Sequence, residues 1–154
     1  MNLLTGSNRN LLNLAVLFLR MMLGSIMFVA GAGKVFGWFG GMGMNATIQA
    51  FQSYMGLSAF WTYLSSYTEL IGGLFLILGF LTRPAALAVT INMLVASVFI
   101  GFKGFFAEKG AAYPFSLMVY SLAILLTGPF SYSLDALLFG SSNRTLNQQF
   151  HNNR

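Results

Sequence analysis

Two long apolar runs that contain ionisable residues constrain this sequence more than any other feature. The run from Leu11 to Phe39 is longer than the ~20 residues that a helix needs to cross a bilayer, yet it contains Arg20 and Lys34. The run over residues 60–81 contains one acid, Glu69. An ionisable group at membrane depth costs roughly 2.5–3.5 kcal/mol on insertion scales and usually faces the interior of a helix bundle, where it pairs. The sequence therefore predicts a bundle in which these charges meet.

Composition places such a chain in a membrane. Hydrophobic residues make up 56% of the 154 residues and charged residues only 7%, whereas soluble domains carry about 25% charged residues. Mean hydropathy is +0.72. The net charge of +5 comes from single Lys and Arg residues scattered along the chain, which is typical of topology signals and contacts with anionic lipid. We expect one domain in the lipid bilayer and no nucleic-acid partner.

The sequence offers few ligands for a cofactor. It has no cysteine, which excludes disulfides, iron–sulfur clusters and cysteine-based zinc sites within the chain. Its one histidine, His151, lies in the polar C-terminal tail, so the apolar part has no histidine for a haem. Methionine in an apolar helix is mostly a packing residue. We expect no metal site and no covalently bound cofactor, so electron transfer would need a diffusible carrier or a partner's cofactor.

The apolar runs predict four transmembrane helices, separated by glycine, proline and polar clusters. Arg20 interrupts the first run, so we expect a retained first helix and not a cleaved signal peptide. The fold class is all-α integral membrane, a four-transmembrane-helix bundle. It comprises a polar lead over residues 1–10, a four-helix domain over 11–139 with helices at 11–35, 60–81, 85–102 and 113–127, and a polar tail over 140–154.

A short amphipathic helix is predicted between the first two transmembrane helices. Asn45 is its expected N-cap, Gly56 ends it, and three apolar residues share one face: Ile48, Phe51 and Met55. Such a helix lies in the membrane interface. We expect it to cover the outer end of the bundle.

Basic residues orient the bundle, because cytoplasmic loops carry an excess of Lys and Arg. Four arginines fall on the side of both termini and three lysines on the other side. We therefore expect both termini to be cytoplasmic. The residues counted are Arg9, Arg83, Arg144 and Arg154 against Lys34, Lys103 and Lys109.

Helix geometry brings Arg20 and Glu69 to similar depths. Arg20 is expected about 13 Å and Glu69 about 18 Å from the cytoplasmic face, a gap that an arginine side chain can bridge. One interpretation is a structural ion pair that fixes helix register. The other is a polar pocket that opens outward under the amphipathic helix and binds a quinone head or a small anion. Lys34, at the outer end of the first helix, either joins this pocket or extends to the interface.

Three residues complete the predicted pocket. Glu69 is the candidate catalytic residue, as a proton relay. Tyr67 lies within one turn of Glu69 and is a candidate hydrogen-bond donor, and Asn92 is the one amide in an uncharged third helix. The predicted ligand-binding residues are thus Arg20, Lys34, Tyr67 and Asn92.

The inner-face turn around Thr82, Arg83 and Pro84 joins the second and third helices. Pro84 suits the first turn of a helix, where its missing N–H costs nothing. Asp135 follows the fourth helix and returns to the same face. We expect Arg83 and Asp135 to form a structural ion pair there.

Short motifs follow one another in a fixed order: Arg20-x-x-x-Gly24 and Gly31-x-x-Lys34, then Glu69-x-x-Gly72-Gly73 with Gly79, then Thr82-Arg83-Pro84, then Gly128-Pro129-x-Ser-Tyr-Ser-Leu-Asp135. The ordered set resembles the DoxX/DoxD-like family of small four-helix membrane proteins and covers most of residues 14–138. Phe130 departs from the family pattern, which often has glycine there.

The resemblance implies three lines of function. Some family members look like the membrane subunit of thiosulfate:quinone oxidoreductase, others are associated with oxidative-stress complexes, and more distant relatives act as membrane chaperones or cargo receptors. It also implies a bacterial or archaeal inner or plasma membrane. By similarity, the family-type polar positions are Arg20, Lys34, Glu69, Arg83 and Asp135.

Residues and resemblance together favour a membrane subunit of a quinone-linked oxidoreductase, with membrane or soluble redox subunits as partners. The alternative is a non-catalytic assembly or scaffold subunit of a larger membrane complex. A transporter is a third reading, which would need a homo-oligomer to supply a pore, because four helices are few and no inverted repeat is visible. The sequence leaves open whether the chain itself is an enzyme.

Overall fold

The computed structural model is all-α within the part of the chain that it describes, residues 9–101, 105–106, 110–129 and 132–139. The predicted 1–10 lead and 140–154 tail lie almost wholly outside these residues. The elements are α1 (Arg9–Phe36), the 3₁₀ turn η1 (Trp38–Gly40), α2 (Gly43–Met55), α3 (Ala59–Leu78), α4 (Thr82–Ile100), α5 (Ala112–Thr127) and α6 (Leu134–Phe139).

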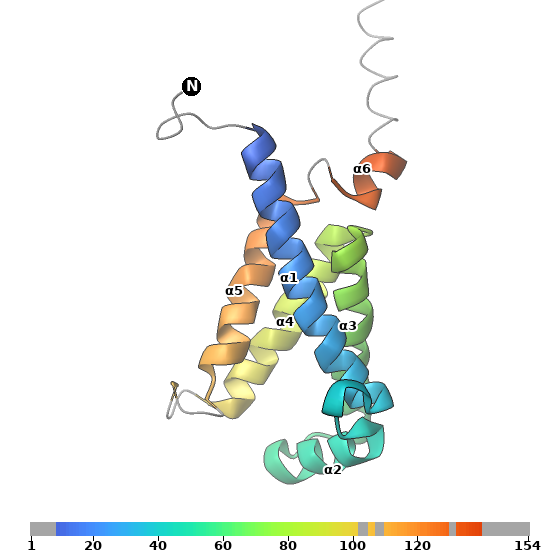
Figure 1. Cartoon of the computed structure of the whole chain (residues 1–154). Coiled ribbons are helices and arrows are strands. Elements are labelled where there is room, and N and C mark those ends of the chain that lie inside the picture. The colour runs from blue at the N-terminus through green and yellow to red at the C-terminus, as the bar shows by residue number, and fades with distance from the viewer. Residues whose placement is uncertain (1–8, 102–104, 107–109, 130–131, 140–154) are drawn as a thin grey trace, which may run out of the picture.

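Four long helices form the body of the molecule, with α2 across one end and α6 at the other (Figure 1). Helix α1 packs mainly on α3, α4 packs on α5, and α3 joins the two pairs through α4. Leu23, Met27 and Leu76 pack with Val89 and Ile124 in the buried core. The end with α6 is called the inner end below and the end with α2 the outer end.

The helix boundaries follow the sequence pattern to within a few residues. Helix α3 stops at Leu78 because Gly79 adopts a left-handed conformation (φ 66°) and its N–H bonds the Leu76 carbonyl, which is a common helix ending. Pro84 lies in the first turn of α4, as predicted. The predicted cap at Asn45 is wrong, because α2 begins two residues earlier, at Gly43, and Asn45 lies inside its first turn. Gly56 ends α2 in a left-handed conformation, as predicted.

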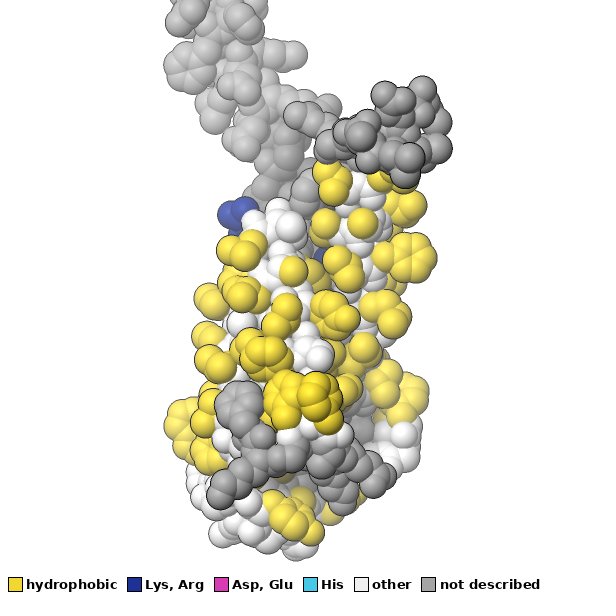
Figure 2. Space-filling model, turned by 90° about the vertical axis from the view of Figure 1, so that its left-hand side faces the viewer, with side chains coloured by type: hydrophobic (Ala, Val, Ile, Leu, Met, Phe, Trp, Pro, Cys, Tyr) yellow, Lys and Arg dark blue, Asp and Glu magenta, His cyan; other side chains and the backbone are white. Residues whose placement is uncertain are grey.

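Helices α1 and α4 are long and apolar enough to cross a membrane, and α5 is a shorter apolar helix. Helix α3 has 20 residues, but its middle is polar, with Ser66 and Glu69 on its buried face. Large hydrophobic side chains lie exposed along the bundle, including Phe18, Ile91 and Val98, and Figure 2 shows such side chains covering one face between the two ends. The chain is thus an all-α protein with two to three candidate spans.

Candidate functional site

A buried ion pair joins α1 to α3 near the outer end. Lys34 Nζ lies 2.6 Å and 2.7 Å from the two carboxylate oxygens of Glu69. The Glu69 side chain is 4% exposed and that of Lys34 28%. Sequence reasoning paired Glu69 with Arg20 instead, and that pairing is wrong. Glu69 has a counter-ion, but it is the lysine from the outer end of α1.

Glycine contacts set the register that selects this pair. A Cβ on Gly31 would lie 2.3 Å from the Leu70 backbone nitrogen, and one on Gly73 would lie 2.4 Å from the Phe28 nitrogen. Such distances are possible only between backbones in direct contact, which small residues permit. Since α1 and α3 run antiparallel (Figure 1), the contact of Gly31 with Leu70 brings Lys34 beside the Glu69 turn. Lys34 therefore lies within about one helical turn of the level of Glu69.

Arg20 lies at the other end of this interface. A Cβ on Gly79 would lie 2.7 Å from Arg20 Nη1, so the guanidinium is beside Gly79. Ten residues separate Gly79 from Glu69, which is about 15 Å along a helix. The depth estimate failed because it placed the start of α1 level with the end of α3. In the structure Gly24 contacts the backbone of α3 at Gly73 and Ile77, so Arg20, one turn before Gly24, lies level with the end of α3. Arg20 therefore reaches the inner turns and not the acid.

The Arg20 guanidinium holds the segment after α5 by backbone contacts. Nη1 donates to the Pro129 carbonyl at 3.0 Å and Nη2 donates to the Tyr132 carbonyl. Arg20 is 2% exposed, and within the described chain its Nε has no hydrogen-bond partner. A buried arginine needs several acceptors, and here they are carbonyls. Its geometry is that of a clamp between α1 and the chain that leads to α6.

Asp135 caps α4. Its carboxylate oxygens accept the Leu81 and Thr82 backbone N–H groups at 2.7 Å and 2.8 Å, which satisfies donors that a helix start leaves unpaired. The Asp135 N–H in turn donates to the Gly79 carbonyl. The predicted ion pair with Arg83 is absent among the described residues. The Arg83 guanidinium lies against Gly128, where a Cβ would meet it at about 3.1 Å.

Asn92 is at the predicted site and Tyr67 is not. The Asn92 amide nitrogen lies 3.4 Å from Glu69 Oε1, a long contact from α4 that brings a third helix to the pair. Tyr67 is 42% exposed and stacks on Tyr63. Residues two apart on a helix do not share a face, so Tyr67 points away from Glu69.

Helix α2 covers the outer side of the pair. Lys34 Nζ lies 5.5 Å from the centre of the Phe51 ring, a distance at which a cation and an aromatic face attract. Ile48, Phe51 and Met55 are all half-buried, as expected for the shared inner face of α2. Phe51 thus closes the site over the ammonium group.

Sequence reasoning missed Ser66. It is fully buried on the same face of α3 as Thr62 and Glu69. Its hydroxyl has no hydrogen-bond partner within the described residues. A serine in an apolar helix is common enough that nothing in the sequence singled it out. Ser66 adds a free donor and acceptor to an interior that already holds a carboxylate, an ammonium group and an amide.

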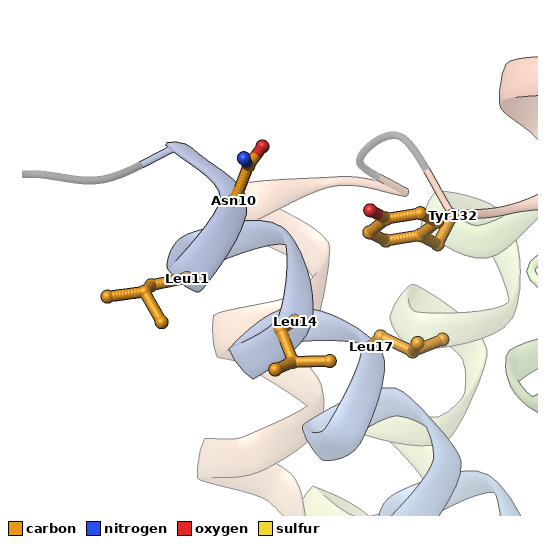
Figure 3. A pocket seen from close by; sticks show the side chains of 5 residues that line it. All are labelled: Asn10, Leu11, Leu14, Leu17 and Tyr132. Atoms are coloured by element: carbon orange, nitrogen blue, oxygen red, sulfur yellow. The ribbon is translucent and has the colours of Figure 1, made fainter.

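A separate open groove of about 450 Å³ lies at the inner end. Asn10, Leu11, Leu14 and Leu17 of α1 line it together with Tyr132 (Figure 3). Leu17 is about 25 Å along α1 from Lys34. The groove and the ion pair are therefore different places on the molecule.

The fold and the buried pair define a class of protein: an all-α chain of span-length apolar helices with an ion pair inside the bundle. The sequence profile of the DoxX family matches residues 15–102. The chain belongs to the DoxX family.

Two curated relatives match most of the chain. A Bacillus subtilis (strain 168) protein named "Putative oxidoreductase CatD" is 32% identical over 126 residues, covering 82% of this chain and 88% of its own length. The "Inner membrane protein YqjF" of Escherichia coli (strain K12) is 32% identical over 134 residues, covering 84% of this chain and 96% of its own. No solved structure matches the chain significantly.

Proposed function

We propose that this protein is the four-span membrane subunit of a quinone-linked oxidoreductase, of the thiosulfate:quinone type. The observation that carries the proposal is the Lys34–Glu69 pair with Asn92, held between three helices of an apolar bundle. Intramembrane ionisable groups are expensive and commonly mark functional sites. The relative named a putative oxidoreductase supports the oxidoreductase role. The relative named an inner membrane protein supports the membrane location.

The arrangement of the helices supports the proposed membrane placement. Helices α3 and α5 accompany α1 and α4 in one bundle (Figure 1), and in the proposal all four cross an inner or plasma membrane together. The N-terminal end of α1 and α6 share the inner end with Arg83, which favours the cytoplasm for that end. Helix α2 then lies at the outer surface. Of the residues counted for orientation, Lys103, Lys109, Arg144 and Arg154 lie outside the described residues.

In the proposed reaction, a quinone takes up two electrons and two protons to become a quinol. The electrons come from a partner subunit, because the chain has no cysteine and its one histidine lies in the tail. Glu69 passes the protons, with Lys34 as its counter-ion. A positioned acid or base of this kind contributes about 100-fold or more to a rate.

Glu69→Gln tests this proposal in complexes purified from native membranes. Quinone reduction driven by thiosulfate, measured per assembled complex, should slow about 100-fold because the amide carries no transferable proton. Thr68→Val is the matched control, since Thr68 is the next residue and its hydroxyl bonds the Leu64 carbonyl. Equal turnover in the wild type and Glu69→Gln would remove Glu69 from the mechanism.

The second candidate is a non-catalytic assembly subunit. It is favoured by Arg20 and Asp135, whose charged groups contact backbone atoms only and hold the inner end together. In that case deleting the chain lowers the yield of the complex, and turnover per assembled complex stays the same. Normal yield without the chain would count against it.

A further inference from the structure

Ser66 and Thr82 have the two side-chain hydroxyls that are buried without a hydrogen-bond partner among the described residues, and of the two Ser66 is on the helix face that carries Glu69. In an apolar helix a hydroxyl normally bonds the carbonyl one turn earlier. Ser66 is fully buried, and in the described chain it makes no such bond. The hydroxyls that do are those of Thr47, Thr62, Thr68, Thr90, Ser97, Ser116 and Thr127.

Helix register places Ser66 at the ion pair. It precedes Glu69 by three residues, one turn on the same buried face of α3. On α1, the contact of Gly31 with Leu70 puts Lys34, three residues further along an antiparallel helix, level with the Ser66 turn. The free hydroxyl therefore lies one turn from Glu69, toward the outer end that α2 covers.

The charges at this place are already balanced. Both oxygens of Glu69 are within 2.7 Å of the Lys34 ammonium group, and the neighbouring Asn92 and Ser66 are neutral. An anion that bound Lys34 would share the ammonium group with Glu69 and place a second negative charge beside a buried carboxylate, which is costly. A neutral molecule adds no such charge and can use the free hydroxyl.

We propose that Ser66, Asn92 and the Lys34–Glu69 pair form the contact site for the neutral, oxygen-bearing head of a membrane-dissolved molecule, with the Ser66 hydroxyl as a direct ligand contact. The inference rests on the proposed function and narrows it. It assigns the site to the quinone head and excludes a small anion as the ligand. It also adds Ser66 to the residues that contact the quinone.

Binding of decylubiquinone to the purified full-length protein in lipid nanodiscs tests the proposal. Ser66→Ala should raise the Kd about 3- to 10-fold, the loss expected for one neutral hydrogen bond. Its melting temperature without quinone should stay the same or rise, because the variant removes an unpaired buried polar group. Ser97→Ala is the matched control: Ser97 is as buried, but its hydroxyl already bonds the Met93 carbonyl, so the Kd should not change. Millimolar thiosulfate, with sulfate as the salt control, should not displace the quinone.

Each of the other outcomes would contradict a particular part of the proposal. An unchanged Kd in Ser66→Ala, with weaker binding in Glu69→Gln, would remove Ser66 and leave the proposed function standing. A lower melting temperature without quinone would make Ser66 a structural residue. Specific displacement by thiosulfate would overturn the neutral-ligand assignment. No binding of decylubiquinone by the wild type would overturn the proposed function and this inference with it.

Discussion

The charges of Arg20 and Lys34, two basic residues of α1, are compensated in different ways. Arg20 has five donors and bonds two carbonyls of the chain that follows α5, one from each Nη atom. Lys34 is a compact charge and meets a carboxylate. The first arrangement holds segments together through backbone carbonyls, with Asp135 near enough to attract the guanidinium. The second leaves a titratable pair inside the bundle, which is why the candidate site is at Lys34 and not at Arg20.

This difference predicts how the pair contributes to stability. Lys34→Met leaves the Glu69 carboxylate buried without a counter-ion, and breaking a buried pair in this way costs about 3 kcal/mol or more. In Lys34→Met/Glu69→Leu neither charge remains, so most of the loss should be recovered. The measurement is the unfolding free energy of both variants and the wild type in mixed detergent micelles. Additive losses in the double variant would show that the two side chains do not interact.

At the scale of the elements, the packing of α3 depends on glycines that differ in the space around them: Gly31 of α1 contacts the backbone of α3, whereas Gly72 of α3 faces α4. A Cβ on Gly31 would meet backbone atoms of α3 at 2.3 Å, whereas a Cβ on Gly72 would meet a methyl group of Val89 at 3.0 Å. A side chain can rotate away, but a helix backbone can move only if the two helices separate. Substitution by alanine should therefore destabilise the protein at Gly31 and have little effect at Gly72.

Gly31→Ala should destabilise the protein by about 2–3 kcal/mol through overpacking and should weaken the Lys34–Glu69 contact, because both residues belong to the interface that opens. Gly72→Ala is the matched control. Its clash is mild, and alanine gains up to about 1 kcal/mol in helix propensity over glycine, so its net effect should be near zero. Thermal unfolding of both variants in the same detergent measures the difference. Equal stability of the two would contradict the close α1–α3 contact.

For the whole molecule, the sequence predicts the helices better than their mutual register. Apolar runs and the glycine and proline breaks locate α1, α4 and α5 to within a few residues. The partner of Glu69 depends on the backbone contacts of Gly24 and Gly31 with α3, which set the register of the two helices and are not visible in an apolar pattern. The role of Asp135 was predicted wrongly for a related reason. In the sequence, a carboxylate that caps α4 from another segment cannot be distinguished from one that pairs with Arg83.

The four-span arrangement can be tested with single cysteines, since the chain has none of its own. Three exposed positions sample the ends of the bundle: Tyr54 in α2, Phe106 between α4 and α5, and Leu137 in α6. In intact bacterial cells, a membrane-impermeant maleimide should label cysteines at 54 and 106, and one at 137 only after permeabilisation. Labelling at both 54 and 106 would place these positions on the same side of the membrane, so that α3 and α4 either both cross it or both do not. Helix α4 is apolar enough to cross, so both would cross. Protection at 137 then requires α5 to cross despite its 16 residues. The reverse pattern would invert the orientation, and labelling at all three would leave α5 outside the membrane.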